Sequence, residues 1–155
     1  MNGDAVIFVP GIKGTKLLET NRANWDTIWS GIQSNFESIE DLELTSAFNG
    51  EFFEENVSSI IRPGEIEALA YGEFLNDLKT NKPIYIFNYD WRLSAQENGI
   101  RLSGFMDYLI AKSKARSENP TPFKKFDFIT HSLGNAVLRN LIHREKLSRI
   151  NKING

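Results

Sequence analysis

Ser132 lies where a strand-like stretch meets a helix-like stretch. The segment from Lys124 to Ile142 begins with a short apolar run, passes through Thr-His-Ser-Leu-Gly and continues with apolar residues at helical spacing. This pattern predicts a strand, a sharp turn and a helix, with Ser132 at the turn. A serine in that position has its hydroxyl raised above the sheet edge, and the helix N-terminus behind it offers unpaired N–H groups to an oxyanion. We therefore interpret Ser132 as a nucleophile.

The motif around Ser132 departs from the pattern G-x-S-x-G at one position. Thr130 stands where the first glycine is expected, and its branched Cβ should crowd a turn that brings strand and helix close together. A second interpretation is that Ser132 is a helix N-cap, which is the commoner role of a serine after a strand. The motif alone leaves both interpretations open.

A glycine loop near the N-terminus is the second feature that could serve chemistry. The continuous apolar run Ala5–Val9 predicts a parallel strand buried on both faces, and Pro10-Gly-Ile-Lys-Gly14 follows it directly. A loop with two glycines and a proline leaves its backbone N–H groups approachable, as an oxyanion donor requires. The alternative is a tight turn without chemical function.

Further strands and helices alternate along the chain. The apolar spacing predicts strands over residues 83–87 and 149–155, and helices over residues 66–80 and 102–110. This alternation predicts an α/β fold with a three-layer parallel sheet. Because the carboxyl ends of parallel strands meet at one edge, we expect the glycine loop and Ser132 to lie together there.

The segment between the glycine loop and residue 66 has a weaker pattern. Aromatic and aliphatic residues at helical spacing predict an amphipathic helix over Trp25–Phe36, which belongs either to the core or to a cap over the site. Residues 37–55 are acidic and without clear periodicity. Arg62-Pro-Gly64 is expected to break the chain.

Asp90 and Arg92 follow the strand predicted over residues 83–87. They share one face if that strand continues, which permits a charged pair. We favour a structural role for this pair over a catalytic one, because ion pairs commonly anchor loops.

Composition excludes several classes of function. A chain of 155 residues with 41% hydrophobic and 25% charged residues predicts a single domain, 1–155, with one core. The net charge of −2 and the mixture of 18 basic with 20 acidic residues argue against a nucleic-acid partner. With no cysteine and two histidines, we expect neither a metal site nor a cofactor.

The N-terminus contains no targeting pattern. No basic segment precedes a long apolar one, and no apolar stretch approaches the roughly 20 residues that span a bilayer. We expect a cytoplasmic chain without a transmembrane segment.

Several segments of the chain occur in the order seen in lecithin:cholesterol acyltransferase-like α/β hydrolases, and the chain resembles this family over almost its whole length. The combination of Tyr-Asp-Trp-Arg ahead of His-Ser-Leu-Gly is the most specific part of the resemblance. The matching segments are Val9–Gly14 with Leu17, Ile28-Trp29, Arg62–Gly64, Phe74-Leu75 with Leu78, Tyr89–Arg92 and His131–Gly134.

The resemblance implies an α/β-hydrolase fold and an acyl-transfer reaction. Ser132 matches the family's acyl-accepting nucleophile, and the backbone N–H groups of Ile12 and Leu133 match its oxyanion hole. Members of the family cleave or transfer fatty acyl groups of lipids, so a lipid-like ester is the implied substrate. Such a substrate is compatible with peripheral contact at a membrane surface. Residues 20–65 correspond to the family's cap region.

The chain also departs from the family pattern. Thr130 replaces a glycine, Asn135 stands where many members have another small residue, and the C-terminal half of the family's fold is missing. In this fold the acid and the histidine that activate the serine follow it in the chain. His143 should lie about 16 Å from Ser132 along the elbow helix, and the side chain of the adjacent His131 should diverge from the serine, so we expect neither to be catalytic.

These departures predict the N-terminal portion of an enzyme. We expect the chain alone to be inactive on esters, marginally folded and prone to aggregate or dimerise, because the strand before Ser132 should lie at a sheet edge with Phe126 and Phe128 exposed. A non-catalytic remnant that serves as a binding or interaction module is an alternative function. A short-chain carboxylesterase is another, distinguished by whether the Trp25–Phe36 stripe is exposed near Ser132 or buried.

Overall fold

In the computed structural model, the chain forms two compact units. Unit 1 comprises Met1–Ile12, Leu78–Phe87 and Ser94–Gly155, and unit 2 comprises Lys13–Asp77 and Asn88–Leu93. The prediction of one domain with an insert over residues 20–65 stays a prediction. The structure describes residues 4–19, 26–29, 45–48, 53–56, 61–78, 80–115, 122–144 and 150–154.

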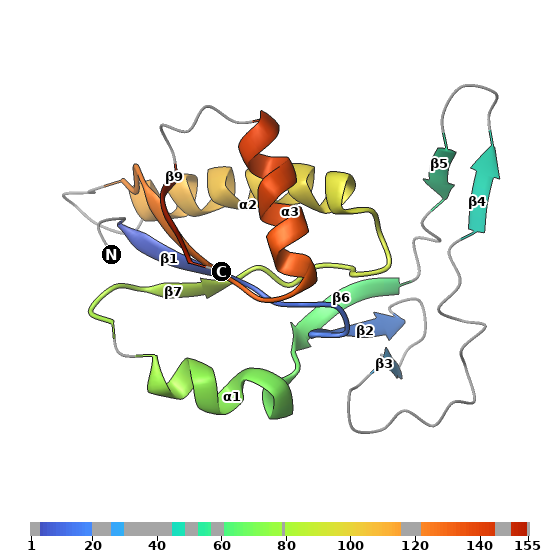
Figure 1. Ribbon diagram of the computed structural model, residues 1–155, viewed down its shortest axis with the longest axis horizontal. Helices are drawn as coiled ribbons and strands as arrows, with labels where there is room; N and C mark the ends of the chain where they lie inside the picture. Colours follow the sequence, from blue (N-terminus) through green and yellow to red (C-terminus); the bar gives the residue numbers. More distant parts are fainter. Residues whose placement is uncertain are drawn as a thin grey trace. The chain divides into compact units, whose positions relative to one another are not determined.

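Unit 1 contains a parallel sheet with the strand order β7-β1-β8-β9 (Figure 1). Its strands are β1 (Ala5–Val9), β7 (Ile84–Ile86), β8 (Phe126–Thr130) and β9 (Ile150–Asn154). All three pairings are parallel, which confirms the predicted class of sheet and all four strands expected in this part of the chain.

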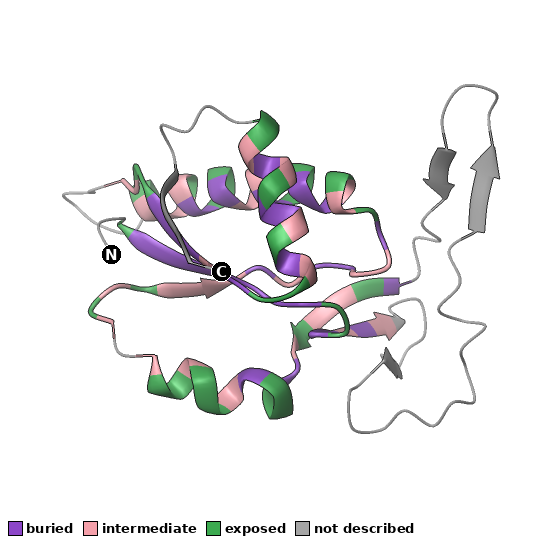
Figure 2. Ribbon diagram, in the orientation of Figure 1, coloured by how far each residue is buried: buried purple, intermediate pink, exposed green. Residues whose placement is uncertain are grey.

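Strand β1 lies inside the sheet and is buried along its whole length (Figure 2). Its neighbour β8 pairs with β1 on one side and with β9 on the other. The expectation that the strand before Ser132 forms a sheet edge is therefore wrong, because the last residues of the chain supply the missing neighbour. Phe126 and Phe128 are both completely buried rather than exposed.

Helix α3 (Leu133–Arg144) packs on this sheet, and a second helix packs against α3. The second helix is α2 (Ala95–Ala115), and α3 contacts both β1 and β8. The helices approach closely at Gly99, where a Cβ would lie 3.0 Å from the Cβ of Asn140. The helix predicted over residues 102–110 is confirmed and is longer at both ends.

The described residues of unit 2 form antiparallel strands and one helix. A three-stranded sheet has the order β3-β2-β6, and β4 pairs with β5 in a separate ladder. The helix confirms the prediction over residues 66–80, although it is shorter. The elements are β2 (Thr15–Glu19), β3 (Asp26–Trp29), β4 (Thr45–Phe48), β5 (Phe53–Asn56), β6 (Ile61–Ile66) and α1 (Ala68–Asp77).

Two predictions for this unit are wrong. Residues 26–29 form strand β3 instead of the start of a helix over Trp25–Phe36, because Thr27, Ile28 and Trp29 are good strand formers and this segment pairs with β2 through Asp26, Thr27 and Trp29. Residues 30–36 lie outside the described residues. Arg62-Pro-Gly64 lies inside β6 rather than breaking the chain. Because β6 pairs with β2 at the edge of the described sheet, its proline is tolerated there.

The described residues thus form an α/β protein with a small parallel sheet and three helices. Within the ranges that the structure describes, none of these helices combines the length and the apolar character needed to cross a bilayer.

Candidate active site

Ser132 lies in an abrupt turn between strand and helix. Strand β8 ends at Thr130 and helix α3 begins at Leu133, so only two residues connect them. The φ angle of Ser132 is 52°, in the left-handed region that residues with a side chain rarely adopt. Ser132 is exposed to solvent. This conformation matches the strained turn on which a nucleophilic serine is presented to substrate.

The chain contains an ordinary N-cap with which Ser132 can be compared. Ser94 directly precedes α2, and its Oγ accepts a hydrogen bond from the N–H of Glu97 at 3.1 Å. Ser132 precedes α3 in the same way, but its left-handed backbone differs from the extended conformation typical of an N-cap. The N–H groups of Gly134 and Asn135 donate to the carbonyls of His131 and Ser132 instead. The N-cap interpretation therefore fits Ser94 and does not fit Ser132.

The glycine loop after β1 runs against this turn. Val9 pairs with Thr130 in register, and the N–H of His131 donates to the Val9 carbonyl at 3.1 Å. A Cβ on Gly11 would lie 2.9 Å from His131 Nδ1 and 3.0 Å from Ser132 Cβ. Since real Cβ atoms avoid such contacts, a side chain at position 11 would force His131 or the loop to shift. The structure therefore brings the two predicted features together.

Gly134 is pressed against the end of β1 from the helix side. A Cβ at this position would lie 2.4 Å from the Val9 carbonyl oxygen and 2.8 Å from that of Pro10. These neighbours are backbone atoms, which cannot move away as the end of a flexible side chain can. The glycine two residues after Ser132 is thus needed for close packing of helix on strand.

The two expected oxyanion donors flank the serine along the chain. Leu133 is the first residue of α3, where N–H groups have no partner within the helix. Ile12 follows Gly11 and is 55% exposed. None of the backbone hydrogen bonds found in the described turns and helix ends is donated by Ile12 or Leu133. Both N–H groups are therefore compatible with the role predicted for them.

Thr130, the residue that stands in place of the expected glycine, has a partner across the turn. Its side chain is buried, and its Oγ1 donates a hydrogen bond to Asn135 Oδ1 at 2.5 Å. Sequence analysis identified both residues as departures from a pattern, but gave no sign that they are partners. A threonine–asparagine pair across a turn has no periodic signature that could have revealed it.

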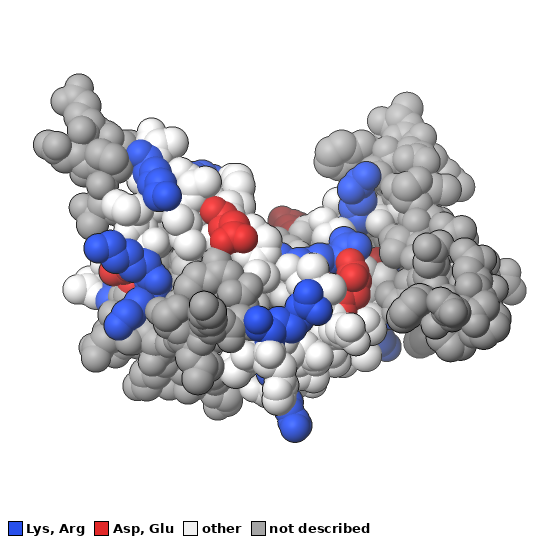
Figure 3. All heavy atoms as spheres, turned by 90° about the horizontal axis from the view of Figure 1, so that it is seen from above, with Lys and Arg blue, Asp and Glu red and all other residues white. Residues whose placement is uncertain are grey.

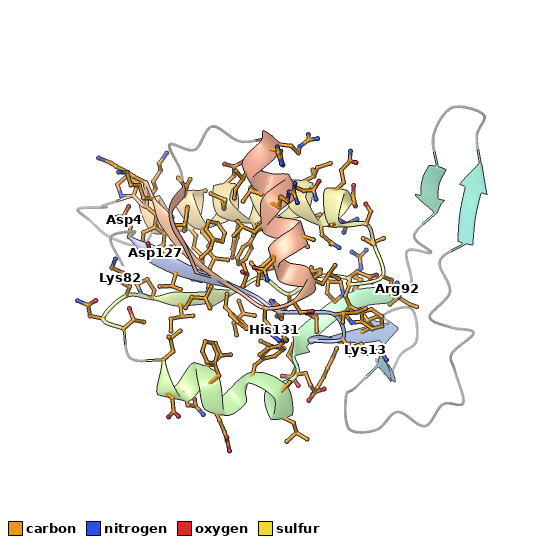
Figure 4. The ribbon with its side chains drawn as sticks, in the orientation of Figure 1. Asp4, Lys13, Lys82, Arg92, Asp127 and His131 are labelled. Atoms are coloured by element: carbon orange, nitrogen blue, oxygen red, sulfur yellow. The ribbon has the colours of Figure 1, made fainter. Side chains whose placement is uncertain are left out.

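Both histidines lie in the described part of the chain. His131 is exposed beside Ser132 at the turn that follows β8 (Figure 4). His143 is exposed in the last turn of α3, at the opposite end of that helix from Ser132. The expectation that neither is the base of a catalytic triad stays a prediction.

The opposite end of β8 holds a different set of charges. Lys82 Nζ lies 3.4 Å from the buried carboxylate of Asp127, and Asp4 accepts hydrogen bonds from the N–H groups of Lys124 and Lys125 (Figure 4). These contacts fix the start of the strand. On the face shown in Figure 3, described basic side chains form separate groups with acidic residues among them, so no continuous basic stripe appears there.

Asp90 and Arg92 form a closed ion pair within unit 2. Arg92 donates from Nε to Asp90 Oδ1 at 2.9 Å and from Nη2 to Oδ2 at 2.6 Å, and both side chains are buried. The pair lies in a turn beyond β7 rather than on a continuing strand. This geometry supports the structural role that we favoured.

Thr15 is a buried residue in unit 2 that sequence analysis missed. Its carbonyl accepts a hydrogen bond from Trp91 Nε1 at 2.9 Å, and its Oγ1 accepts one from the Tyr89 N–H at 3.4 Å. These bonds hold the Tyr-Asp-Trp-Arg segment to β2. No group of three or more histidine, aspartate and glutamate residues in the described ranges is arranged to hold a metal ion.

Comparisons with known proteins add no relative. No family model matches the chain, and neither a curated protein nor a solved structure matches it.

Proposed function

We propose that this chain carries the nucleophile of a serine acyl hydrolase or acyltransferase, and that Ser132 accepts the acyl group. The observation that carries the proposal is the exposed, left-handed Ser132 in a two-residue turn between strand and helix, against which Gly11 packs. The parallel sheet with the glycine loop and the serine at one edge supports a three-layer α/β-hydrolase fold. The resemblance alone implies a cap over residues 20–65.

The proposed substrate is a lipid-like ester. The support for it is the resemblance of Val9–Gly14, Tyr89–Arg92 and His131–Gly134 to lecithin:cholesterol acyltransferase-like enzymes. The side chains of the Trp25–Phe36 stripe, which would distinguish this substrate from a short-chain ester, lie outside the described residues. A substrate series from short to long acyl chains therefore provides the test of this part.

The reaction proceeds in two steps. Ser132 Oγ attacks the ester carbonyl carbon and gives up its proton, and the carbonyl oxygen becomes an oxyanion that accepts hydrogen bonds from the N–H groups of Ile12 and Leu133. The carbon–oxygen bond to the alcohol then breaks, the alcohol leaves with a proton, and the acyl group remains on Ser132. Water or a second alcohol attacks this acyl-enzyme and restores the serine.

The proton of Ser132 needs a base, and the proposal assigns neither histidine to it. His143 lies at the other end of α3 from the serine. His131 is the neighbour of Ser132 in the turn, and we expect their side chains to diverge. An imidazole held by an acid is the usual base for serine. The proposal therefore requires that this imidazole comes from a residue other than His131 and His143.

A fluorophosphonate probe tests the nucleophile directly. It is applied to the product of the full coding sequence, which the proposal requires to supply the base for Ser132. In that protein we expect labelling of Ser132 that Ser132→Ala abolishes. Ser94→Ala is the matched control, because Ser94 also precedes a helix but acts as its N-cap, and labelling should be retained.

Two results would overturn the proposal. Labelling that persists in Ser132→Ala would place the reactive residue elsewhere. Absence of labelling in every folded form of the protein would show that Ser132 is not a nucleophile, and would favour the alternative function of a binding module.

A further inference from the structure

The two residues at which the sequence departs from the expected motif are bonded to one another. Thr130 is the last residue of β8 and Asn135 the third residue of α3. The hydrogen bond from Thr130 Oγ1 to Asn135 Oδ1 therefore passes across the turn that contains Ser132. It links a strand side chain to a helix side chain, with the serine between them.

Burial and helix geometry both explain why this bond forms. Thr130 is only 6% exposed, so its hydroxyl needs a partner within the protein. In a helix the Cα–Cβ bond tilts toward the N-terminus, and the side chain of Asn135 accordingly reaches back over the turn. Asn135 itself is exposed, so packing does not compel its orientation.

The left-handed conformation of Ser132 has to be maintained by contacts between the surrounding residues. A serine held in the left-handed region costs about 1–3 kcal/mol, and the surrounding structure must supply that energy. The bonds that Gly134 and Asn135 N–H donate to the carbonyls of His131 and Ser132 lie within the turn and the helix start. The Thr130–Asn135 bond adds a connection from the strand, so that strand and helix cannot separate without breaking it.

We propose that Thr130 and Asn135 are positioning residues for Ser132. Their hydrogen bond keeps the serine backbone left-handed, which fixes the direction of Oγ and the place of the Leu133 N–H. The expected motif has a glycine at position 130. In this chain the position is a threonine, and its hydrogen bond to Asn135 holds the turn instead. The proposal rests on the proposed function in which Ser132 is the nucleophile.

The proposed effect on the conformation of Ser132 can be tested in a protein that has no enzymatic activity. Thr130→Val keeps the shape of the side chain and removes the hydroxyl, Thr130→Ser keeps the hydroxyl, and Asn135→Ala removes the acceptor from an exposed position. Backbone chemical shifts of Ser132 report its conformation, and amide hydrogen exchange reports opening of residues 133–135. We expect Thr130→Val and Asn135→Ala to lose the left-handed shifts and to exchange faster, and Thr130→Ser to resemble the wild type.

The catalytic part is tested by the kinetics of fluorophosphonate labelling. We expect Thr130→Val and Asn135→Ala each to lower the maximal labelling rate by about 10-fold or more, because small displacements of a reacting group are costly, while probe affinity stays unchanged. Thr130→Ser should keep most of the rate. Since the two residues act through one bond, the double variant Thr130→Val/Asn135→Ala should be no slower than the slower single variant.

The outcomes separate this proposal from the proposed function. Unchanged Ser132 shifts in folded Asn135→Ala and Thr130→Val, or equal labelling rates in all variants, would overturn the positioning role and leave the nucleophile in place. Altered shifts in those variants, together with a wild type whose Ser132 is never labelled, would support the conformational role and overturn the nucleophile.

Discussion

At the scale of single residues, the site depends on positions where a side chain is absent as much as on those where one is present. Gly11 allows a close approach to the side chains of His131 and Ser132, and Gly134 allows a close approach to backbone carbonyls at the end of β1, so that Ser132 lies beside the loop after β1. Ser132 itself was predictable from the sequence, because strand, turn and helix patterns meet at it. The hydrogen bond between Thr130 and Asn135 could not be predicted, because it depends on the conformation of the turn, which the spacing of apolar residues does not reveal.

Gly134→Ala should destabilise the protein by about 2 kcal/mol or more, because the new methyl group would overlap backbone carbonyls that cannot move aside. Gly104→Ala is the matched control. Gly104 lies within α2 with open space around it, so alanine should stabilise the protein by about 0.5–1 kcal/mol. Urea unfolding measures both, and equal effects at the two positions would contradict the close packing of α3 on β1.

Tyr89→Phe should alter the stability at high pH. Burial, with a smaller contribution from Tyr71, raises the pKa of Tyr89 well above its ordinary value of about 10. As pH rises past that ordinary value, the unfolded chain ionises first and the native state loses stability, by at most about 1.4 kcal/mol per pH unit. The wild type should therefore lose stability above about pH 10 more steeply than Tyr89→Phe. The measurement is urea unfolding of both proteins at a series of pH values. An equal loss of stability with pH in the wild type and in Tyr89→Phe would show that the phenol ionises in the native state as readily as in the unfolded chain.

At the scale of elements, the parallel sheet could be predicted and the antiparallel strands could not. Strand β1 is buried on both faces, so its sequence is a continuous apolar run that periodicity detects. Strand β6 contains Pro63 and Gly64, residues that normally mark a turn, and its pairing with β2 overrides that signal. The glycine loop after β1 was predicted with its position relative to Ser132, because both follow neighbouring parallel strands.

Ile12→Pro should reduce turnover, or the maximal rate of fluorophosphonate labelling, by about 10²-fold or more, since proline removes the N–H proposed to stabilise the oxyanion. Substrate binding should change less. Ile12→Val retains the N–H and is the control, for which we expect nearly wild-type rates. A folded Ile12→Pro protein with wild-type rates would show that the loop is an ordinary turn.

At the scale of the whole molecule, each unit is assembled from segments that are distant in the sequence. Residues 88–93 belong to unit 2 because Tyr89 and Trp91 bond to Thr15, although the strand before them belongs to unit 1. Such long-range bonds have no local signature, which explains why sequence analysis indicated one continuous unit. The proposed nucleophile, Gly11 and Ile12 of the glycine loop, and the first residues of α3 all lie within unit 1.

The placement of the two histidines leads to a prediction for the 155-residue chain as a whole. Helix α3 is continuous from Leu133 to Arg144, so its rise separates His143 from Ser132 by about 16 Å. We therefore expect no Ser132-dependent hydrolysis of a nitrophenyl ester by this chain. Because the defect is a missing base, free imidazole in solution should restore measurable hydrolysis in the wild type and not in Ser132→Ala.

Hydrolysis without added imidazole that disappears in Ser132→Ala would contradict this account and place a base within the chain. His131→Ala and His143→Ala would then identify it, since each removes one imidazole from an exposed position. A loss in His131→Ala would identify the imidazole next to Ser132 as the base. Retained activity in both variants would point to a carboxylate as the base, and the proposal would then have to be rebuilt around that group.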